Sequence, residues 1–325
     1  MMRTIALEEH FATPAFLSGP GRAMAEQARV AGGGRMLDLL ADVGDERIAA
    51  MDRAGIDVQV LSLTAPGVEQ SEAGEAVPLA RETNDHAAEV VRRHPDRFAA
   101  FAALPTAAPD YAADELERVV REHGFVGALI NGHTRGRYLD DEFFWPILER
   151  AEALRVPIYL HPTPPPRAVI EASYLGNYAP EVGEVFATSG WGWHIETATH
   201  VLRIVLSGAF DRFPELQVVI GHMGEGLSFM MPRFEHVMSH VVKLQRPVGE
   251  YFTTNLHYTF AAFNWTPTFL NLLLQVGVDR ILFATDHPYG SMERARSFLD
   301  QLPVGGPDRE RIAYRNAELL LGLPS

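Results

Sequence analysis

The chain has 325 residues, 47% of them hydrophobic, which suits either two ordinary domains or one large α/β barrel. Its 28 Lys and Arg residues against 42 Asp and Glu give a net charge of −14, which argues against binding to nucleic acid or to anionic membranes. Cysteine is absent, so disulfides, thiolate nucleophiles and cysteine zinc sites are excluded. The sequence shows no signal-peptide pattern and no long apolar run, and we expect a cytoplasmic protein.

Short β-type runs alternate with amphipathic helical stretches along the chain. Eight runs are apolar enough for strands covered on both faces, at residues 4–10, 58–64, 98–104, 125–131, 156–161, 216–222, 255–260 and 280–285. The clearest helical periods occupy residues 45–56, 76–94, 110–124, 140–155 and 194–210. This alternation predicts an α/β fold, a (β/α)₈ TIM-type barrel that forms one domain over residues 1–325. A doubly wound sheet is the rival fold, but no Gly-rich fingerprint follows the first strand.

Two insertions interrupt the alternation. Residues 15–36 are rich in Gly and Ala, and residues 163–190 contain many Pro, Tyr and Gly. Each insertion follows a strand with a polar end, the first and the fifth. We therefore expect both to be loops over the carboxyl-terminal mouth of the barrel.

The first strand, in "TIALEEHFATP", ends in Glu8, Glu9 and His10. A buried strand tolerates such groups when they are paired or bind something. Side chains alternate along a strand, so Glu8 and His10 share one face and Glu9 lies on the other. Barrel active sites lie at the carboxyl ends of the strands, where His161 ends the fifth strand and Asp286 the eighth. Two imidazoles and two carboxylates suit Zn²⁺ or Mn²⁺, and the predicted ligands are Glu8, His10, His161 and Asp286.

Each of these residues also has an ordinary structural interpretation. A single histidine at a strand end is commonly a hydrogen-bonded core residue, and Asp286 in "TDHP" could cap the next helix. The metal hypothesis gains its weight from four ligand types at the same end of separate strands. His222, in "GHMGE" after the sixth strand, has Glu225 three residues later, which favours an acid/base whose tautomer the carboxylate fixes. The alternatives for His222 are a further metal ligand or a structural histidine.

These motifs resemble those of one enzyme family. Glu-x-His on the first strand, "HP" after the fifth, "GHMGE" after the sixth and "TDHP" after the eighth are similar to the amidohydrolase-related decarboxylases of the amidohydrolase superfamily. Segments such as "PDRFAAFAALP" and "DRILFATDHP" extend the likeness over nearly the whole chain. The resemblance implies one Zn²⁺ or Mn²⁺ on Glu8, His10, His161 and Asp286, with the catalytic residues His222 and Glu225 beside the substrate.

The resemblance also implies two arginines that bind the substrate carboxylate. These are Arg47 in "DERIAAMD" and Arg233 in "MMPRFEH", the second of which would reach in from a neighbouring subunit of a homodimer or homotetramer. From the sequence pattern alone, both would be ordinary helix-surface arginines.

The family's chemistry would be non-oxidative decarboxylation of a hydroxylated aromatic or enol-type carboxylic acid. Asp286 would deliver a proton to the ring carbon and His222 would handle the phenolic proton. The first alternative is a mononuclear hydrolase of an ester, lactone or amide. The second is a barrel that has lost its catalytic activity and serves as a binding module. Glu-x-His in place of His-x-His, and no lysine in "FVGALINGH", argue against a bridged two-metal centre.

Three segments depart from the family pattern and would line the substrate pocket. They are His287 after the strand-eight aspartate, "NLHYTFAAFN" at the seventh strand and the insertion that runs into "WGWH". We expect His287 to contact the substrate and aromatic residues to form a wall for it, with barrel packing as the alternative role of each. The aromatic candidates are Phe11, Trp191, Trp193, Tyr258 and Phe260.

Overall fold

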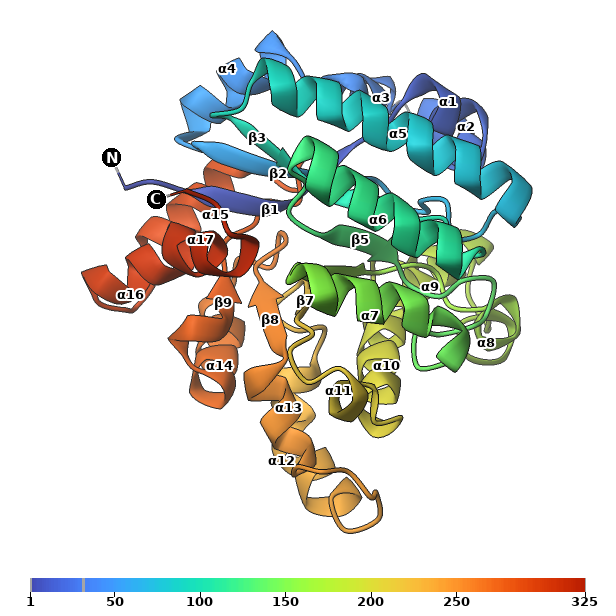
Figure 1. Ribbon diagram of the computed structural model, residues 1–325, viewed down its shortest axis with the longest axis vertical. Coiled ribbons are helices and arrows are strands. Elements are labelled where there is room, and N and C mark those ends of the chain that lie inside the picture. The colour runs from blue at the N-terminus through green and yellow to red at the C-terminus, as the bar shows by residue number, and fades with distance from the viewer. Residues whose placement is uncertain (1, 31–32, 325) are drawn as a thin grey trace.

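Parallel strands form the centre of the molecule in the computed structural model, which describes residues 2–30 and 33–324 (Figure 1). The strands in this part of the chain are β1 (Ile5–Phe11), β2 (Val58–Leu63), β3 (Phe98–Ala100), β4 (Ala102–Ala103), β5 (Ala128–Asn131), β6 (Ile158–His161), β7 (Val218–Ile220), β8 (Leu256–Thr259) and β9 (Ile281–Leu282). The hydrogen-bonded orders are β1-β2-β3 and β4-β5-β6-β7-β8-β9.

Two contacts turn these two sheets into one closed barrel. The amide of Phe101, between β3 and β4, donates to the Leu61 carbonyl at 2.9 Å, so β3 and β4 are halves of the single strand expected at 98–104. The amide of Leu7 donates to the Phe283 carbonyl at 3.0 Å, and a parallel bridge joins Leu7 to Ala284. The prediction of a (β/α)₈ barrel with eight strands is therefore confirmed.

Helices surround the barrel. They are α4 (Asp45–Ala54), α5 (Ala73–Arg93), α6 (Pro109–His123), α7 (Trp145–Leu154), α10 (Gly192–Leu206), α11 (Ala209–Arg212), α12 (Leu227–Met238), α13 (Val248–Thr254), α14 (Thr266–Val276), α15 (Met292–Asp300), α16 (Gly306–Glu310) and α17 (Asn316–Leu321). The five segments with the clearest helical period are all helical. The largest boundary difference is at α7, because Asp141 accepts a hydrogen bond from the Phe143 amide and caps a short 3₁₀ turn at Glu142–Phe144 instead.

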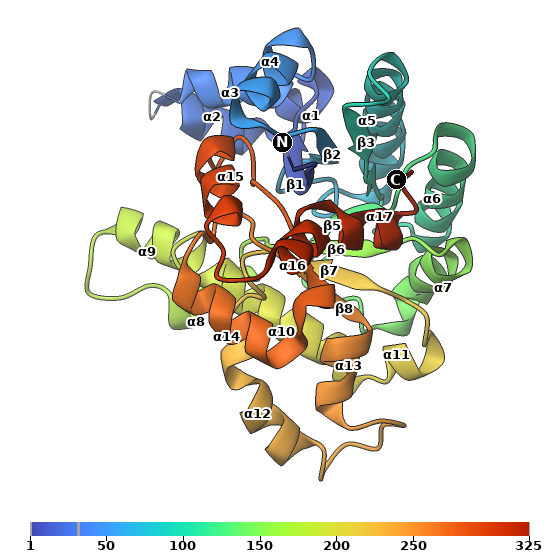
Figure 2. The same ribbon diagram turned by 90° about the vertical axis from the view of Figure 1, so that its left-hand side faces the viewer.

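The two insertions are not the plain loops that we expected. The first folds as α1 (Pro14–Ser18), α2 (Arg22–Val30) and α3 (Gly34–Ala41), and the second contains α8 (Arg167–Ser173) and α9 (Pro180–Ala187). Residues 31–32 lie outside the described residues. Alanine is the best helix former, and buried Phe16, Leu37 and Leu40 hold the first insertion against the barrel. Figure 2 shows α9 of the second insertion at the edge of the molecule.

Two layers of apolar side chains pack on the barrel wall. The inner layer contains Ile5, Leu7, Val60, Leu129 and Val219, and residues of α17 cover it at the amino-terminal end. A larger outer layer packs between the strands and the helices. The barrel is thus a filled core, and room for polar chemistry is left at its carboxyl-terminal end.

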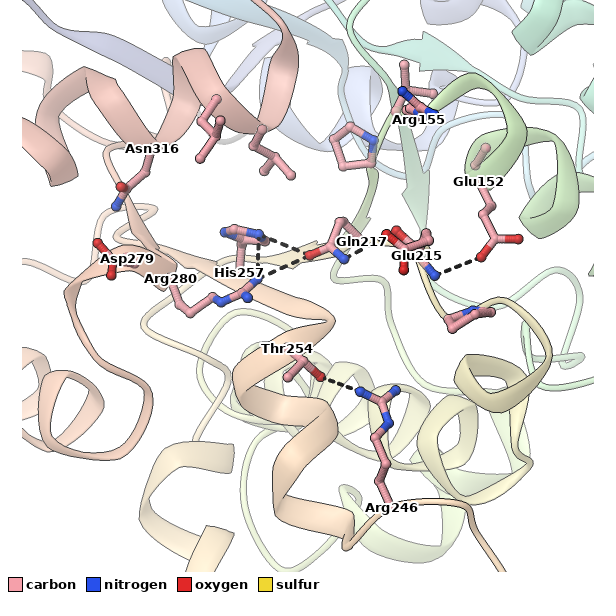
Figure 3. Close-up of a pocket in the computed structure, with 16 residues that line it drawn as sticks. Glu152, Arg155, Glu215, Gln217, Arg246, Thr254, His257, Asp279, Arg280 and Asn316 are labelled. Carbon is pink, nitrogen blue, oxygen red and sulfur yellow. Dashed lines mark hydrogen bonds between the residues drawn. The ribbon is translucent and has the colours of Figure 1, made fainter.

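A cavity of about 1100 Å³ opens at the opposite, amino-terminal end of β6, β7 and β8 (Figure 3). Its lining includes Arg155, Gln217, His257 and Arg280, and Arg280 donates to the ring nitrogen Nε2 of His257 at 3.0 Å. Its lining contains none of the predicted site residues.

Among the helices of the described residues, none is long and apolar enough to cross a membrane.

One buried histidine gives a testable pH dependence of stability. His200 in α10 accepts a hydrogen bond from the Leu139 amide through Nε2 at 2.8 Å. Burial, and then the nearby His133 and Arg203, lower the pKa of His200 to about 3. Between its unfolded pKa of about 6.5 and pH 3, the unfolded chain binds a proton at His200 that the folded protein does not. The stability that this neutral histidine contributes is therefore lost as the pH falls below about 6.5.

We expect His200→Gln to weaken this acid sensitivity, because the glutamine oxygen can accept from the Leu139 amide without taking up a proton. Each pH unit below the unfolded pKa is worth about 1.4 kcal/mol per group. Between pH 7 and pH 5 the unfolding free energy of the wild type should therefore fall by about 2 kcal/mol more than that of the variant. Urea unfolding at both pH values measures this difference, and equal losses would contradict the prediction.

Candidate metal centre and active site

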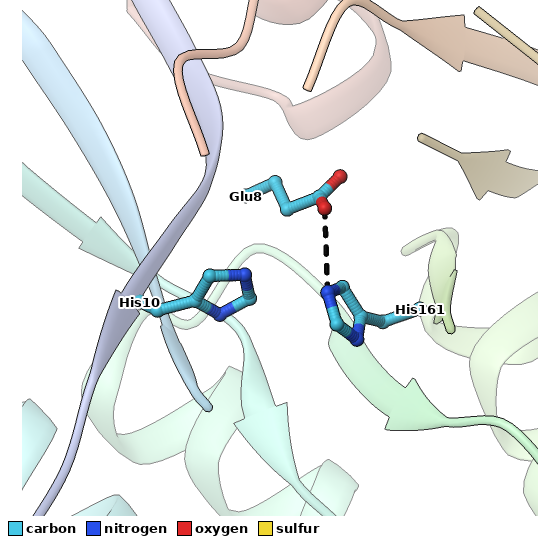
Figure 4. A group of neighbouring side chains, drawn as sticks. All are labelled: Glu8, His10 and His161. Atoms are coloured by element: carbon cyan, nitrogen blue, oxygen red, sulfur yellow. Dashed lines mark ion pairs between the residues drawn. The ribbon is translucent and has the colours of Figure 1, made fainter. Parts of the chain in front are cut away.

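Four predicted ligands meet at the carboxyl-terminal end of the barrel. Glu8, His10 and His161 each offer a ligand atom, and these atoms lie within 4.8 Å of one another (Figure 4). Asp286 belongs to the same place, because one of its oxygens is 3.3 Å from Nε2 of His10 and it forms a second such group with Glu8 and His222. The cluster gathers residues from β1 and β6 and from the segment after β9.

Local backbone geometry points Glu8 into the cluster. The pairing of β1 with β2 shifts register between Ala6 and Glu9, and Glu8 has a φ of 63°. A non-glycine residue with positive φ in a strand marks a bulge that redirects its side chain. Glu9 faces the other way, as predicted from the alternation of side chains, and accepts from the amide of Thr285 at 2.8 Å and from Nε2 of Gln59 at 2.7 Å.

The hydrogen bonds of His161 and Glu8 fit a bound cation. Nδ1 of His161 lies 2.9 Å from the Pro162 carbonyl oxygen, which can only accept, so Nδ1 carries the proton of the neutral ring and Nε2 keeps its lone pair. That lone pair is 3.3 Å from Oε1 of Glu8, an oxygen that is buried without a hydrogen-bond partner among the described residues. Two acceptors held face to face repel each other unless a cation lies between them.

The surroundings of His10 and Asp286 also fit a bound cation. Nε2 of His10 is also buried without a partner among the described residues. Burial, followed by the electrostatic effect of the neighbouring His161, lowers the pKa of His10 well below the usual value. The neutral imidazole is the form that binds a metal. Burial, and then the carboxylate of Glu8, raise the pKa of Asp286 well above its usual range. A divalent cation would relieve the repulsion between these two carboxylates.

Tyr159 holds the first of these carboxylates in place and was missed in the sequence. It lies two residues before His161, so it points to the same face of β6, inside the barrel. Its hydroxyl donates to Oε2 of Glu8 and lies 2.7 Å from Oγ1 of Thr259. This contact leaves Oε1 as the oxygen that faces the histidines.

We expect Tyr159→Phe to weaken metal binding by about 10- to 100-fold, because residues that orient a ligand carry effects of this size. The measurement is the dissociation constant for Mn²⁺ and for Zn²⁺ of the purified variant. Tyr258→Phe is the matched control, since the Tyr258 hydroxyl is buried nearby in β8 but donates to the Phe252 carbonyl at 2.8 Å. Equal metal affinities in the two variants would contradict this role of Tyr159.

His222 and Glu225 lie on a left-handed turn after β7. All five residues from 222 to 226 have positive φ, between 49° and 87°, and only Gly224 and Gly226 adopt such angles without strain. Strained backbone of this kind gathers at functional sites. The turn brings Nδ1 of His222 to 2.7 Å from Oε1 of Glu225 and Nε2 to 3.7 Å from Oε1 of Glu8.

The Glu225 carboxylate makes His222 a strong base in this geometry. Burial lowers the pKa of His222, but the charges of Glu225 and Glu8 outweigh it and raise the pKa to about 10. A cation bound at Glu8 would oppose part of this rise. Burial would also raise the pKa of Glu225, yet His222 and a hydrogen bond from His194 bring it down to about 2.

Arg47 supports the site from behind β1. It is buried, its Nε donates to Oε1 of Gln59 at 2.7 Å and its Nη1 donates to the His10 carbonyl at 2.7 Å. Most of its donors are thus committed to the protein. Nη2 has no partner among the described residues, and the predicted contact with a substrate carboxylate would fall to that nitrogen.

The positions of three aromatic residues differ from the expected pocket wall. Phe11 stacks on His86 of α5, with ring centroids 6.1 Å apart, on the opposite face of β1 from His10. Tyr258 reaches the Phe252 carbonyl, and Phe260 packs in an aromatic cluster with Phe283 and other rings. Phe11, Tyr258 and Phe260 belong to the outer packing layer between strands and helices. Their contacts therefore argue against the substrate-binding role assigned to them.

The side chains of three further predicted substrate residues are not part of the metal cluster. Arg233 is exposed on α12 and lines a groove between α10 and α12. His287 is buried and lines a cavity with Arg47; burial, followed by the charge of Arg47, lowers its pKa to about 3. Trp191 is 52% exposed.

Two aromatic rings that the sequence did not single out lie beside the cluster. The Tyr289 ring centroid is 5.6 Å from that of His10, and the Tyr289 hydroxyl is 2.7 Å from Oγ1 of Thr64. Phe263 lies 5.4 Å from the His222 ring. Both residues follow predicted strands by a few positions. The sequence therefore predicted that they lie in loops at the strand ends, but not that their side chains point toward the cluster.

Comparisons with known proteins agree with this geometry. The amidohydrolase family model matches residues 36–323. The γ-resorcylate decarboxylase of Polaromonas sp. (strain JS666) is 37% identical over 331 residues, which cover 98% of each chain. Dihydroxybenzoic acid decarboxylase from Polaromonas sp. JS666, solved with bound manganese and the inhibitor 2-nitroresorcinol, superposes with a TM-score of 0.90 at 36% identity over 99% of this chain and 98% of that one.

A second solved structure covers both chains completely. It is 5-carboxyvanillate decarboxylase from Sphingomonas paucimobilis, with a TM-score of 0.92 and 31% identity. The barrel, the convergent ligand cluster and full-length similarity to these enzymes all agree. The chain therefore belongs to the amidohydrolase family, in its group of amidohydrolase-related decarboxylases.

Proposed function

We propose that this protein is a metal-dependent, non-oxidative decarboxylase of a hydroxylated aromatic acid, such as a dihydroxybenzoate. One observation carries the proposal. Four potential metal ligands, Glu8, His10, His161 and Asp286, lie next to an acid/base pair formed by His222 and Glu225. The full-length similarity to decarboxylases of dihydroxybenzoate and 5-carboxyvanillate supports this chemistry over hydrolysis.

Glu8, His10, His161 and Asp286 would hold one divalent ion in this proposal. Such an ion supplies positive charge that neutralises substrate oxygens and stabilises negative charge that develops during the reaction. We propose Mn²⁺ as the natural ion and Zn²⁺ as the alternative, because a relative was solved with manganese. Metal analysis of the purified protein decides between the two.

The protein's own groups would move the protons. The carboxyl of Asp286 gives its proton to the ring carbon that bears the carboxylate, which interrupts aromaticity. The carbon–carbon bond then breaks, CO₂ leaves and its bonding electrons restore the aromatic ring. His222 keeps Nδ1–H on Glu225, so its Nε2 faces the cluster and exchanges a proton with the phenolic hydroxyl. A new C–H bond replaces the C–C bond, and no redox step is needed.

A substrate panel tests the function. The metal-loaded protein is incubated with 2,6-dihydroxybenzoate, 2,3-dihydroxybenzoate, 5-carboxyvanillate and a simple aromatic lactone, and CO₂ and acid release are followed. We expect CO₂ and the matching phenol from at least one of the three acids, and loss of that activity on chelation with recovery on adding Mn²⁺ or Zn²⁺. Acid release from the lactone without CO₂ from any acid would support the hydrolase alternative instead.

We also propose that the protein forms a homodimer through α12, the helix farthest from the barrel in Figure 1. Phe229 in α12 and Val241 just after it are 76% and 78% exposed, and Met230 of α12 is half-exposed and lines the groove between α10 and α12. Exposed apolar patches of this kind are typical of contact surfaces. Light scattering of the wild type and of Phe229→Glu tests this, with a dimer expected for the first and a monomer for the second.

A further inference from the structure

The carboxylate of Glu225 is bound by two imidazoles, although the proposed mechanism uses only one of them. Nδ1 of His222 lies 2.7 Å from Oε1, and Nδ1 of His194 lies 2.5 Å from Oε2. The Glu225 side chain is fully buried, so these two rings take the place of water around its charge. Each carboxylate oxygen therefore has its own ring donor.

The tautomer of His194 follows from its second nitrogen. Nε1 of Trp193 lies 3.2 Å from Nε2 of His194, and an indole N–H can only donate. Nε2 therefore keeps its lone pair on this side, and the ring proton is on Nδ1, where it is donated to Glu225. The Ser189 carbonyl is also 3.2 Å from Nε2 and would accept a proton if the ring became charged. Both states of the ring keep the Nδ1–H bond to Glu225.

Packing fixes the His194 ring against the acid/base pair. Its centroid is 4.7 Å from that of His222, in an edge-to-face arrangement, and Phe263 contacts both rings at 5.3 Å and 5.4 Å. His194 belongs to the first turn of α10, where the partial positive charge of a helix end also favours a nearby carboxylate. The ring is thus held by its own helix, by His222 and by Phe263.

The same three side chains could be considered as a second cation site, since ligand atoms of His194, His222 and Glu225 lie within 4.8 Å of one another. The hydrogen bonds argue otherwise. Both Nδ1 atoms face the carboxylate at hydrogen-bond distance, so both carry protons there and neither offers a lone pair to a metal.

We propose that His194 is a positioning residue for decarboxylation: it binds the outer oxygen of Glu225, and so keeps that carboxylate aligned on Nδ1 of His222 and leaves Nε2 of His222 free for the substrate. Without His194, Glu225 would lose one of its two donors and could rotate away from His222. The His222 proton could then move to Nε2, which is the wrong tautomer for taking a phenolic proton. The inference rests on the proposed decarboxylation, but its effect on the His222 tautomer does not.

The test compares two variants of His194 in the metal-loaded, full-length protein with 2,6-dihydroxybenzoate as the substrate. His194→Phe keeps a ring but has no donor, and we expect kcat to fall by about 10- to 100-fold while KM changes by less than about threefold. His194→Asn places an amide N–H near the position of Nδ1, and we expect kcat within about fivefold of the wild type. His86→Phe, a ring-for-ring change in α5 on the outer side of β1, should leave kcat unchanged.

A second readout does not depend on turnover. Nitrogen NMR of the zinc-loaded protein, recorded at a pH where the His222 ring is neutral, reports which of its nitrogens carries the proton. We expect Nδ1–H in the wild type and in His194→Asn but a mixture in His194→Phe. The inference is overturned if kcat of His194→Phe stays within about twofold of the wild type, if His194→Asn falls as far as His194→Phe, or if the His222 tautomer is the same in all three. A wild type that releases no CO₂ but shows these tautomers contradicts the proposed function and leaves the positioning contact standing.

Discussion

Asp286→Asn should abolish decarboxylation while leaving the barrel folded. Asparagine has nearly the same shape but no proton to give, and removing a general acid costs about 10²- to 10⁴-fold in rate. The folded state should not suffer from this change. Burial, together with the nearby carboxylate of Glu8, raises the pKa of Asp286 well above its usual range. A neutral amide there removes a repulsion between two carboxylates. The measurements are kcat for CO₂ release, metal content, circular dichroism and thermal unfolding.

Asp279→Asn is the matched control for this experiment. Its side chain is mostly exposed at the amino-terminal end of the barrel, where it lines the large cavity far along the strands from the cluster. We expect wild-type kcat for this variant. An Asp286→Asn protein that is folded, metal-loaded and fully active would refute the role of Asp286 as the proton donor.

Glu8→Ala should remove the metal rather than the fold. Oε1 of Glu8 is the acceptor that faces His161 and lies 3.7 Å from His222, so its loss deletes a charged ligand from the centre of the cluster. We expect metal affinity to fall by at least about 100-fold, with turnover lost in parallel, because outer-sphere changes alone reach this size. The metal content after dialysis and the titrated dissociation constant measure this effect.

Glu9→Ala separates ligation from support one residue along the same strand. Glu9 accepts hydrogen bonds from Thr285 and Gln59 on the other face of β1. Its removal therefore leaves these two buried donors without an acceptor. We expect its unfolding free energy to fall by about 2–3 kcal/mol while metal affinity stays within about threefold of the wild type. If Glu8→Ala remained fully metallated, or if Glu9→Ala lost the metal to the same extent, the assignment of Glu8 as a ligand would be wrong.

The barrel was predictable because its signal is local. Continuous apolar runs marked each strand, and only the strand at 98–104 is divided in the structure, where the Phe101 amide pairs with β2. The insertions were harder. Gly and Ala at 15–36 looked like a loop, whereas buried Phe16 and Leu37 give α1 and α3 an apolar face against the barrel. Composition alone does not show which few residues in a Gly-rich segment are anchored.

The cluster was predictable for a different reason: barrel topology brings the strand ends together whatever lies between them. Tyr159 could have been found by the same alternation that placed Glu8 and His10, since it is two residues from His161. The alternation also places Phe11 opposite His10, which the proposal of an aromatic wall overlooked. His194 could not be located in this way, because it comes from a helix and its contact with Glu225 depends on tertiary packing.

The left-handed turn at 222–226 carries a consequence for how this sequence can change. His222, Met223 and Glu225 each hold a backbone conformation that costs a non-glycine residue roughly 1–2 kcal/mol. Glycine would relieve that cost at each of the three positions, but at His222 or Glu225 it would also remove the acid/base pair. The strain of this turn is thus a cost in stability that the barrel carries for its chemistry, and a variant with glycine at 222 and 225 should be more stable and inactive.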